Sequence, residues 1–193
     1  RMNGTPGGVN MWKVGSKFIG AKERMRMEQA AARLVKARIK MDDSGGLDVQ
    51  QVRMRARRMK QKYNVGLIIV DHIQLLHDRE KAKQGRQIEV AAISKHLKEL
   101  AKELKLPVLA LGQLNRNIED RGKQGRPKLS DLRDSGMLEA DADTVMLLHR
   151  PCKHPGDDEY DDKTLAVVDI AKQRNGPTGI VNLNFEEEYI RFT

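Results

Sequence analysis

Short runs of branched apolar residues alternate with amphipathic segments along the chain. The unbroken run at residues 67–70, LIIV, is typical of a strand that is covered on both faces, as in a parallel sheet. Residues 88–104 carry apolar positions at helical spacing, which predicts a helix with one buried face. The same spacing predicts helices at residues 21–37 and 48–63, and the second of these begins with a D-x-x-Q capping box.

Further strand patterns fill the second half of the chain. VLALG follows a proline, and two longer apolar runs occupy residues 144–149 and 165–173. After the turn NGPTG, the runs IVNLNF and YIRF complete a β-meander, and a weaker pattern predicts a short strand at residues 37–41. Strands that alternate with helices and then finish in hairpins predict one α/β domain over residues 1–193. Its sheet is mostly parallel and flanked by helices, with an antiparallel β-meander at the C-terminal edge.

Composition adds a strong excess of positive charge. The 193 residues carry a net charge of +9, which favours an anionic partner, above all nucleic acid. A basic protein without such a partner is the alternative. Aromatic residues make up only 4% of the chain, so we expect contact with nucleic acid to be mainly to phosphates rather than by base stacking.

The chain has no feature of a secreted or membrane protein. Its one cysteine, Cys152, excludes an intrachain disulfide and fits a reducing compartment, the cytoplasm. No apolar run approaches transmembrane length, so we expect no membrane partner. The first residues, RMNGTPGGVN, lack the apolar core of a secretory signal and a starting Met, so we expect a segment of a longer protein.

Polar side chains stand at the ends of the predicted strands, where open α/β sheets bind ligands. Asp71 follows the first strand, where a carboxylate holds Mg²⁺ in phosphate-loop enzymes, although it also fits a cap of the next segment. Gln113 follows the next strand and could hydrogen-bond a terminal phosphate.

Two basic residues, Lys172 and Arg174, lie at the end of the predicted strand at residues 165–173. Lys172 and Arg174 occupy alternate positions and so point the same way. They could present positive charge to phosphate oxygens in the same subunit or in a neighbour. A solvated strand edge is the alternative.

Four sequence blocks in this order resemble the C-terminal motor domain of the replicative hexameric DNA helicases, the DnaB family. The blocks are LIIVDHIQLL, LALGQLNR, RPKLSDLRDSGMLEADADTVMLLHR and IAKQRNGPTGIVNLNF, and the likeness runs from about residue 8 to Thr193. The resemblance implies a RecA-like core that uses ATP and Mg²⁺. It also implies a six-subunit ring that moves 5′ to 3′ on single-stranded DNA and unwinds the duplex at the replication fork, with a primase and a helicase loader as partners.

The same resemblance implies roles for individual residues. Asp71 matches the Walker B carboxylate for Mg²⁺, and Gln113 matches the phosphate-sensing glutamine. Lys172 and Arg174 match the pair that reaches into the neighbouring subunit's ATP site, with Arg174 as the arginine finger. The loop that tracks the DNA backbone is matched by Arg133, Asp134 and Gly136.

The sequence departs from the family pattern mainly in what it lacks. It contains no GxxxxGK[ST] phosphate loop, and the family's catalytic Glu is also missing. We therefore expect residues 1–193 to be the C-terminal portion of the ATPase domain, inactive in ATP hydrolysis by itself. Smaller departures are His72 in place of an aromatic residue, Gly112 in place of Ser, and Asp134 in place of Glu.

Alternatives stay open at the level of the whole chain and of two local clusters. Besides the helicase motor, the chain fits an ATPase-deficient module for DNA binding or ring assembly. A RecA-type recombinase is a third possibility, which the blocks SDLRDSG and KQRNG disfavour.

The basic helix at residues 53–62 could touch DNA or be a solvated outer face. A zinc site would need the insertion at residues 151–163 to fold back, and its spacing fits no standard zinc pattern. Its ligands would be His149, Cys152, His154 and either Asp157 or Asp158.

Overall fold

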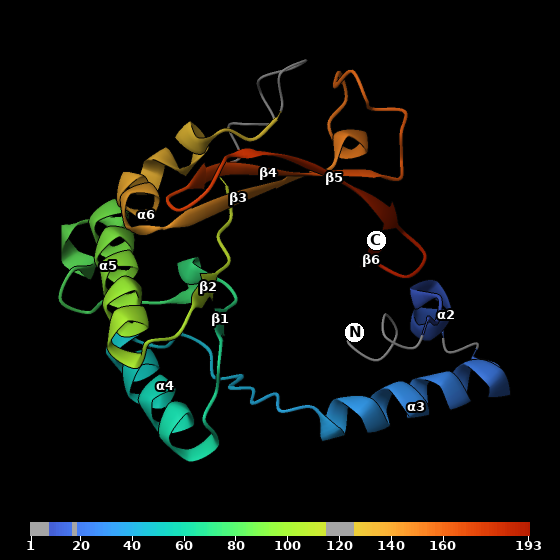
Figure 1. Cartoon of the computed structure of the whole chain (residues 1–193), viewed down its shortest axis with the longest axis horizontal. Coiled ribbons are helices and arrows are strands. Elements are labelled where there is room, and N and C mark those ends of the chain that lie inside the picture. The colour runs from blue at the N-terminus through green and yellow to red at the C-terminus, as the bar shows by residue number, and fades with distance from the viewer. Residues whose placement is uncertain (1–7, 17–18, 115–125) are drawn as a thin grey trace.

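In the computed structural model, helices cover one face of a small parallel sheet, and an antiparallel sheet forms the C-terminal part (Figure 1). The structure describes residues 8–16, 19–114 and 126–193, without the side chains of residues 11, 15–16 and 133–136. The α-helices are α2 (Met11–Ser16), α3 (Ala21–Lys36), α4 (Val49–Tyr63), α5 (Arg86–Leu104) and α6 (Gly136–Asp141). The strands are β1 (Ile68–Val70), β2 (Val108–Ala110), β3 (Thr144–His149), β4 (Leu165–Gln173), β5 (Gly179–Glu186) and β6 (Arg191–Phe192). Short 3₁₀ turns are η1 (Ile73–Leu75), η2 (Ala82–Gln84), η4 (Leu129–Ser135) and η5 (Pro151–Lys153).

The parallel sheet packs on α4 and α5. Strands β1 and β2 pair in parallel, with Ile68 opposite Val108, and α5 forms the crossover between them. Side chains alternate between the two faces of a strand, so one face joins the hydrophobic core while Ile69 on the other face remains 59% exposed. The buried core cluster consists of Val49, Val70, Ile73, Leu76, Ile93 and Leu97. The predicted burial of β1 on both faces is therefore wrong for this chain alone, because no described element covers its second face.

The start of α4 and the C-terminal meander follow the sequence predictions. The Gln50 N–H donates to Asp48 Oδ1 at 2.9 Å, and the Asp48 N–H donates to Gln51 Oε1 at 3.0 Å, which completes the capping box. Strands β3, β4, β5 and β6 are neighbours in that order, and all three pairs are antiparallel. The α/β class, with flanking helices and an antiparallel C-terminal meander, is confirmed.

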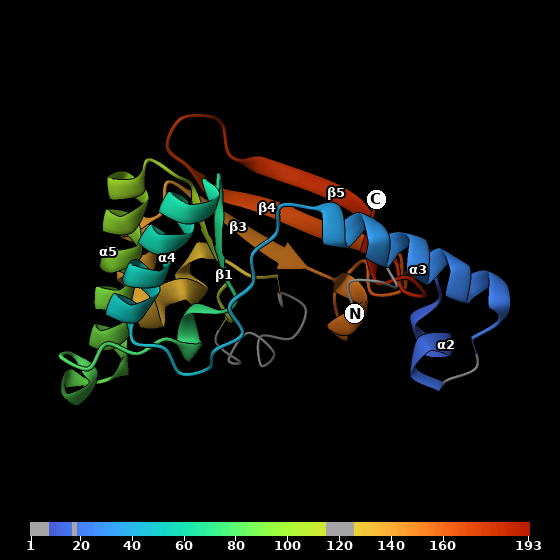
Figure 2. The ribbon, with the colours of Figure 1, turned by 90° about the horizontal axis from the view of Figure 1, so that it is seen from below.

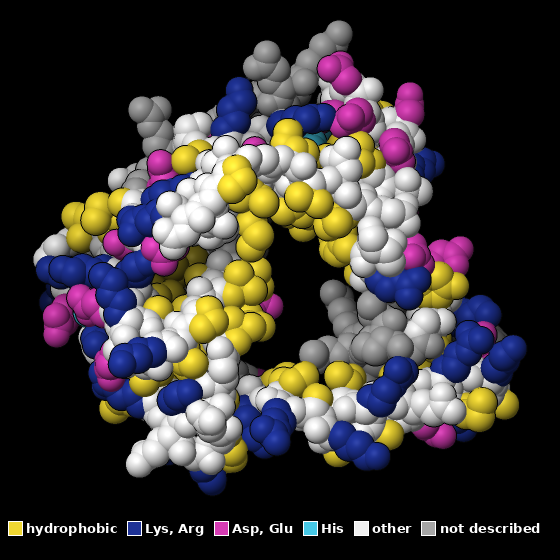
Figure 3. All heavy atoms as spheres, in the orientation of Figure 1, with side chains coloured by type: hydrophobic (Ala, Val, Ile, Leu, Met, Phe, Trp, Pro, Cys, Tyr) yellow, Lys and Arg dark blue, Asp and Glu magenta, His cyan; other side chains and the backbone are white. Residues whose placement is uncertain are grey.

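An N-terminal arm lies across a hollow from the core. Helices α2 and α3 stand opposite α4 and α5 (Figures 1 and 2), and hydrophobic side chains gather on the rim of the hollow (Figure 3). Val35 on α3 is 85% exposed. The strand predicted at residues 37–41 is absent from this described part of the chain, because an extended segment needs a pairing partner to form a strand. Within the described residues, none of the helices is long and apolar enough to cross a membrane.

Candidate functional site

Asp71 and Gln113 emerge at the same carboxyl edge of the parallel sheet. The Leu111 N–H donates to the Val70 carbonyl at 2.9 Å, and the Ile73 N–H donates to the Leu111 carbonyl at 2.9 Å. These bonds continue the pairing of β1 and β2 beyond the strands and place Leu111 opposite the Asp71–His72 step. The structure therefore brings together the two polar residues that the sequence places at strand ends.

The Asp71 carboxylate is open to solvent. Its side chain is 75% exposed, and its Oδ1 lies 3.9 Å from His72 Nδ1. Phosphate-loop enzymes bind Mg²⁺ through one or two carboxylates together with phosphate oxygens and water. An exposed carboxylate at a strand end fits that role as a single ligand. The other ligands would have to come from the nucleotide, from water and from a phosphate loop.

Gln113 is held by its backbone rather than by its side chain. Its N–H donates to Gln74 Oε1 at 3.2 Å, and its carbonyl accepts from Gln74 Nε2 at 3.0 Å. The Gln113 side chain makes no hydrogen bond in the part of the chain that the structure describes. Its amide is thus available to an external ligand.

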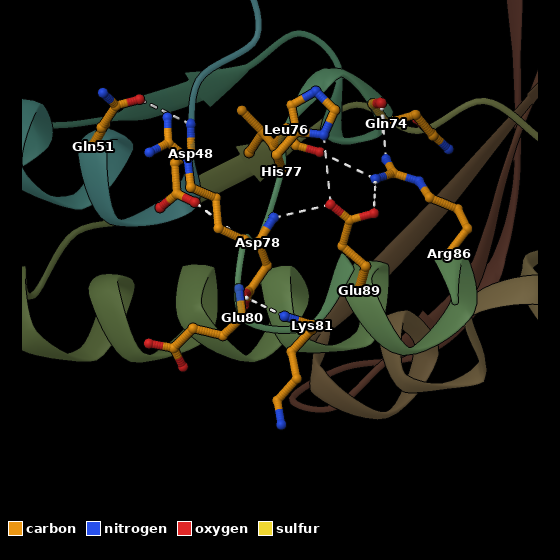
Figure 4. Close-up of polar contacts among 11 residues, drawn as sticks. Asp48, Gln51, Gln74, Leu76, His77, Asp78, Glu80, Lys81, Arg86 and Glu89 are labelled. Carbon is orange, nitrogen blue, oxygen red and sulfur yellow. Dashed lines mark hydrogen bonds and ion pairs between the residues drawn. The ribbon is translucent and has the colours of Figure 1, made fainter. Parts of the chain in front are cut away.

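A buried carboxylate anchors the turn that carries Gln74 (Figure 4). The Arg86 guanidinium donates to the Gln74 carbonyl at 2.9 Å, to the Leu76 carbonyl at 3.3 Å and to Glu89 Oε2 at 2.5 Å. The other Glu89 oxygen accepts from the Asp78 N–H at 3.0 Å. Burial raises the pKa of Glu89, but the hydrogen bonds from Asp78 and Arg86 outweigh burial and hold that pKa below its ordinary value.

Sequence reasoning did not single out these residues as candidate site positions. Gln74 is a polar residue between the apolar Ile73 and Leu75, which was the available signal. Arg86 and Glu89 are an oppositely charged pair three residues apart in the first turn of α5, a common pattern on solvated helices. Only the fold shows that this pair faces η1.

Lys172 and Arg174 lie together, as predicted, but contact a helix end. Lys172 Nζ donates to the Glu139 carbonyl, and Arg174 Nη2 donates to the Ala140 carbonyl at 2.7 Å. The last carbonyls of a helix lack partners within the helix and attract cations. Among the contacts of the described residues, none joins this pair to Asp71 or Gln113.

The Asp143 carboxylate lies beside Arg174 and pairs with two cations. It accepts from Lys98 Nζ at 2.5 Å and from Arg174 Nη1 at 3.3 Å, and its carbonyl accepts from the Arg174 N–H at 2.9 Å. The hydrogen bond from Lys98 holds the pKa of the Asp143 carboxyl below its ordinary value. Because the Asp143 side chain is 57% exposed, water screens these ion pairs and each contributes little to stability.

The predicted DNA-tracking residues lie in η4 and at the start of α6. Arg133 and Asp134 fall within η4, and Gly136 begins α6. Their side chains lie outside the described residues, as does most of the basic loop at residues 115–128. The assignment to DNA thus stays a prediction.

In the possible zinc cluster and on the basic helix at residues 53–62, several side chains bond to other residues of the chain. His149 Nε2 lies 2.9 Å from Asp157 Oδ2, and both side chains are buried. No group of three or more metal-ligating side chains occurs in the described part of the chain, so the zinc hypothesis finds no support there. On the basic helix, Arg57 makes a twofold hydrogen bond to Glu103 of α5 at 2.5 and 2.8 Å, and Arg55 bonds Asp42. Part of the positive charge of this helix is therefore paired with carboxylates of the same chain.

A small surface pocket lies away from all predicted site residues. It is found at the start of α4, and its lining consists of Asp48, Gln50, Gln51, Asp78, Arg79 and Glu80. The candidate site is thus an open sheet edge rather than this pocket.

Comparison with known sequences matches the chain to replicative DNA helicases. Over 192 residues the chain is 38% identical to the replicative DNA helicase DnaC of Bacillus subtilis and 39% identical to DnaB of Geobacillus stearothermophilus. Each of these matches covers 100% of this chain and 42% of the relative. Identity to DnaB of Haemophilus influenzae is 46% over 153 residues, 79% of this chain and 32% of that protein. The chain therefore spans about two fifths or less of the length of these curated relatives.

Comparison with solved structures gives the same kind of match. A structure described as an ATPase domain matches with a TM-score of 0.89 and 35% identity, over 99% of this chain and 67% of that one. A DnaB-like replicative helicase, described with its interactions with primase, matches with a TM-score of 0.86 and 33% identity, over 99% of this chain and 47% of that one. These neighbours confirm the RecA-like fold. The family model of the DnaB-like helicase C-terminal domain matches residues 1–193, and the chain belongs to this family.

Proposed function

We propose that residues 1–193 are the C-terminal part of an ATP-dependent replicative DNA helicase motor. In this proposal six copies form a ring that moves 5′ to 3′ on single-stranded DNA and unwinds duplex at the replication fork in the cytoplasm. The observation that carries it is the carboxyl edge of β1 and β2, where an exposed Asp71 stands beside a backbone-fixed Gln113. Family membership and the net charge of +9 support it further.

The edge of the parallel sheet would serve the nucleotide. Asp71 would supply one oxygen ligand to Mg²⁺, which neutralises charge on the phosphate oxygens when it is bound with ATP. The Gln113 amide would hydrogen-bond the terminal phosphate, and loss of that phosphate would remove the bond. Because Gln113 adjoins the basic loop that follows it in sequence, the change would be passed towards DNA.

Lys172 and Arg174 would act in a neighbouring subunit. In their own subunit these side chains bond carbonyls of α6. In the ring they would exchange these contacts for phosphate oxygens of the neighbour's ATP, where a guanidinium stabilises the charge of the transition state. The DNA backbone would be contacted through Arg133, Asp134 and Gly136.

A segment outside residues 1–193 would complete the domain. It would carry the phosphate loop and the catalytic Glu, since the chain holds no GxxxxGK[ST] sequence. The relatives are longer than the chain, and apolar side chains remain open on β1, β2 and β3, among them Ile69, Leu109 and Met146. A primase and a helicase loader are the protein partners we propose, the first because a structural neighbour is described with its interactions with primase.

Steady-state ATP hydrolysis tests this proposal against the ATPase-deficient alternative. We expect the complete protein to hydrolyse ATP with Mg²⁺ and single-stranded DNA, and Asp71→Ala to abolish turnover. Residues 1–193 alone should be inactive, because losing one electrostatic stabiliser often costs about 3–4 kcal/mol of barrier and several are missing together. Turnover by the fragment that depends on Asp71 would refute the assignment of the missing loop. A complete protein without turnover would favour the module for DNA binding or ring assembly.

A further inference from the structure

We propose that Gln74 is a positioning residue for Gln113: its side-chain amide fixes the Gln113 backbone so that the sensor side chain is presented at the carboxyl edge of β1 and β2. The inference rests on the proposed role of Gln113. It adds a residue that acts on the nucleotide only through another residue.

The contact uses both polar groups of the Gln74 amide. Oε1 accepts from the Gln113 N–H at 3.2 Å while Nε2 donates to the Gln113 carbonyl at 3.0 Å. A residue of a neighbouring antiparallel strand would make the same pair of bonds through its own N–H and carbonyl. The side chain thus extends the pairing of β1 and β2 past Leu111, where the backbone ladder ends.

Gln113 has no other backbone anchor within the described residues. Its N–H and carbonyl bond only to Gln74 there, and residues 115–125 lie outside the description. Fixing both groups of one residue defines its local backbone, and therefore the direction in which its side chain leaves the chain. A catalytic or sensing group gains from such fixation because small misplacements are costly.

Gln74 is itself fixed from α5 (Figure 4). Arg86 binds the Gln74 carbonyl at 2.9 Å and the Leu76 carbonyl at 3.3 Å, so it holds the turn η1 on both sides of Leu75. Glu89, which is 5% exposed, holds Arg86 in place at 2.5 Å. These contacts together form a clamp on Gln113. The clamp starts at the buried Glu89 carboxylate in the first turn of α5 and ends at the proposed sensor, Gln113.

The amide group suits this task better than other side chains of similar size. A carboxylate at this position has no donor for the Gln113 carbonyl, and a Met side chain has neither a strong donor nor a strong acceptor. Gln74→Met therefore removes both bonds while nearly conserving volume. Gln74→Ala removes the same bonds without introducing a bulky group, and serves if Met is poorly accommodated.

The test is a double-mutant cycle on ATP hydrolysis by the complete protein with Mg²⁺ and single-stranded DNA. We expect Gln74→Met to lower kcat by about tenfold with KM changed less than about twofold, since the substrate contacts remain. In the Gln113→Ala background the same change should cost little more, because there is no sensor side chain left to position. Gln61→Met, on the exposed face of α4, is the matched control and should leave kcat unchanged.

A direct physical measurement separates positioning from a general loss of stability. Amide exchange at Gln113 should accelerate in Gln74→Met, while exchange in the core of α5 and the thermal midpoint stay at wild-type values. Gln113→Ala with normal kcat would overturn the sensor role itself. If Gln113→Ala impairs hydrolysis but Gln74→Met does not, or if the two losses multiply fully, the positioning role is wrong while the proposed function stands.

Discussion

Two regions of the molecule hold their candidate functional groups in opposite ways. At the carboxyl edge of β1 and β2, the Gln113 backbone is clamped and its side chain is left open. At the end of β4, the side chains of Lys172 and Arg174 are themselves occupied by carbonyls at the end of α6. A group that serves a ligand in its own subunit can be fixed in advance. Under the proposed function, Lys172 and Arg174 would first have to exchange these internal contacts for contacts in the neighbouring subunit.

The two regions also differ in how firmly their groups are held. The clamp on Gln74 leads back to a buried Glu89, whereas Arg174 and Asp143 are 49% and 57% exposed. Exposed ion pairs contribute about 0–1 kcal/mol, so the Arg174 contacts can be exchanged at little cost. The difference predicts that perturbing the region of Gln113, the proposed sensor end, changes local stability. Perturbing the region of Arg174, the proposed finger end, should change hydrolysis without unfolding.

Arg174→Ala should give the largest effect. An arginine finger contributes roughly a thousandfold or more in rate, so we expect kcat of the complete ring to fall by about that factor while nucleotide binding stays near normal. Mixed rings with a variant that lacks the phosphate-binding lysine should recover part of the activity, because some interfaces then combine intact halves. Arg191→Ala on β6, which removes another guanidinium paired with a carboxylate of the same sheet, is the control. Wild-type turnover by Arg174→Ala rings would remove the trans assignment.

Removing the Glu89 charge should give the next largest effect. Glu89→Gln takes a charged acceptor away from Arg86 and the Asp78 N–H, which we expect to cost about 2 kcal/mol of local opening free energy at pH 7. Because the pKa of Glu89 is lowered from 4.5 in the folded protein, its stabilisation is fully present above pH 4.5 and is lost as the pH falls through the lowered value.

Hydrogen exchange of residues 73–78, compared between wild type and Glu89→Gln at each pH, measures this difference. It should shrink as the solution becomes more acidic than pH 4.5. Glu28→Gln on the exposed face of α3 should show no such dependence. A difference that stays constant down to the acid limit would mean that the Glu89 charge does not anchor η1.

The parts of the fold that depend on local sequence patterns could be predicted from the sequence. Local patterns predicted α4 with its capping box, strand β3 and the meander, because each rests on residues that are near one another in sequence. Asp71 and Gln113 were predicted to meet because parallel strands end at one edge. The clamp could not be predicted, because Gln74 meets Gln113 across 39 positions and a polar residue in a short turn has no distinct pattern.

The two failed strand expectations share one physical origin. The run at residues 67–70 and the segment at residues 37–41 both show apolar or β-forming patterns. Such patterns report the burial and pairing that a segment is suited to, and the partners can lie elsewhere. In this chain Ile69 is exposed and residues 37–41 form no strand. The contacts of Lys172 and Arg174 with α6 were also missed, since alternation gives a common direction but not a target.

Neutralising Asp143 should give the smallest effect, and it tests the exchange of contacts at the finger end. Asp143→Asn weakens the attraction for Arg174 but leaves the Ala140 carbonyl and the backbone bond in place. If the internal contact competes with the neighbour's phosphate, hydrolysis at limiting ATP should become about two- to threefold faster, the size expected for an exposed ion pair. The gain should fade as salt screens the pair in wild type. Lys98→Met removes the other ion pair of Asp143 and keeps Arg174, so it should not speed hydrolysis. Slower hydrolysis by Asp143→Asn would show instead that Asp143 guides Arg174 rather than competing for it, and the two regions would then work alike.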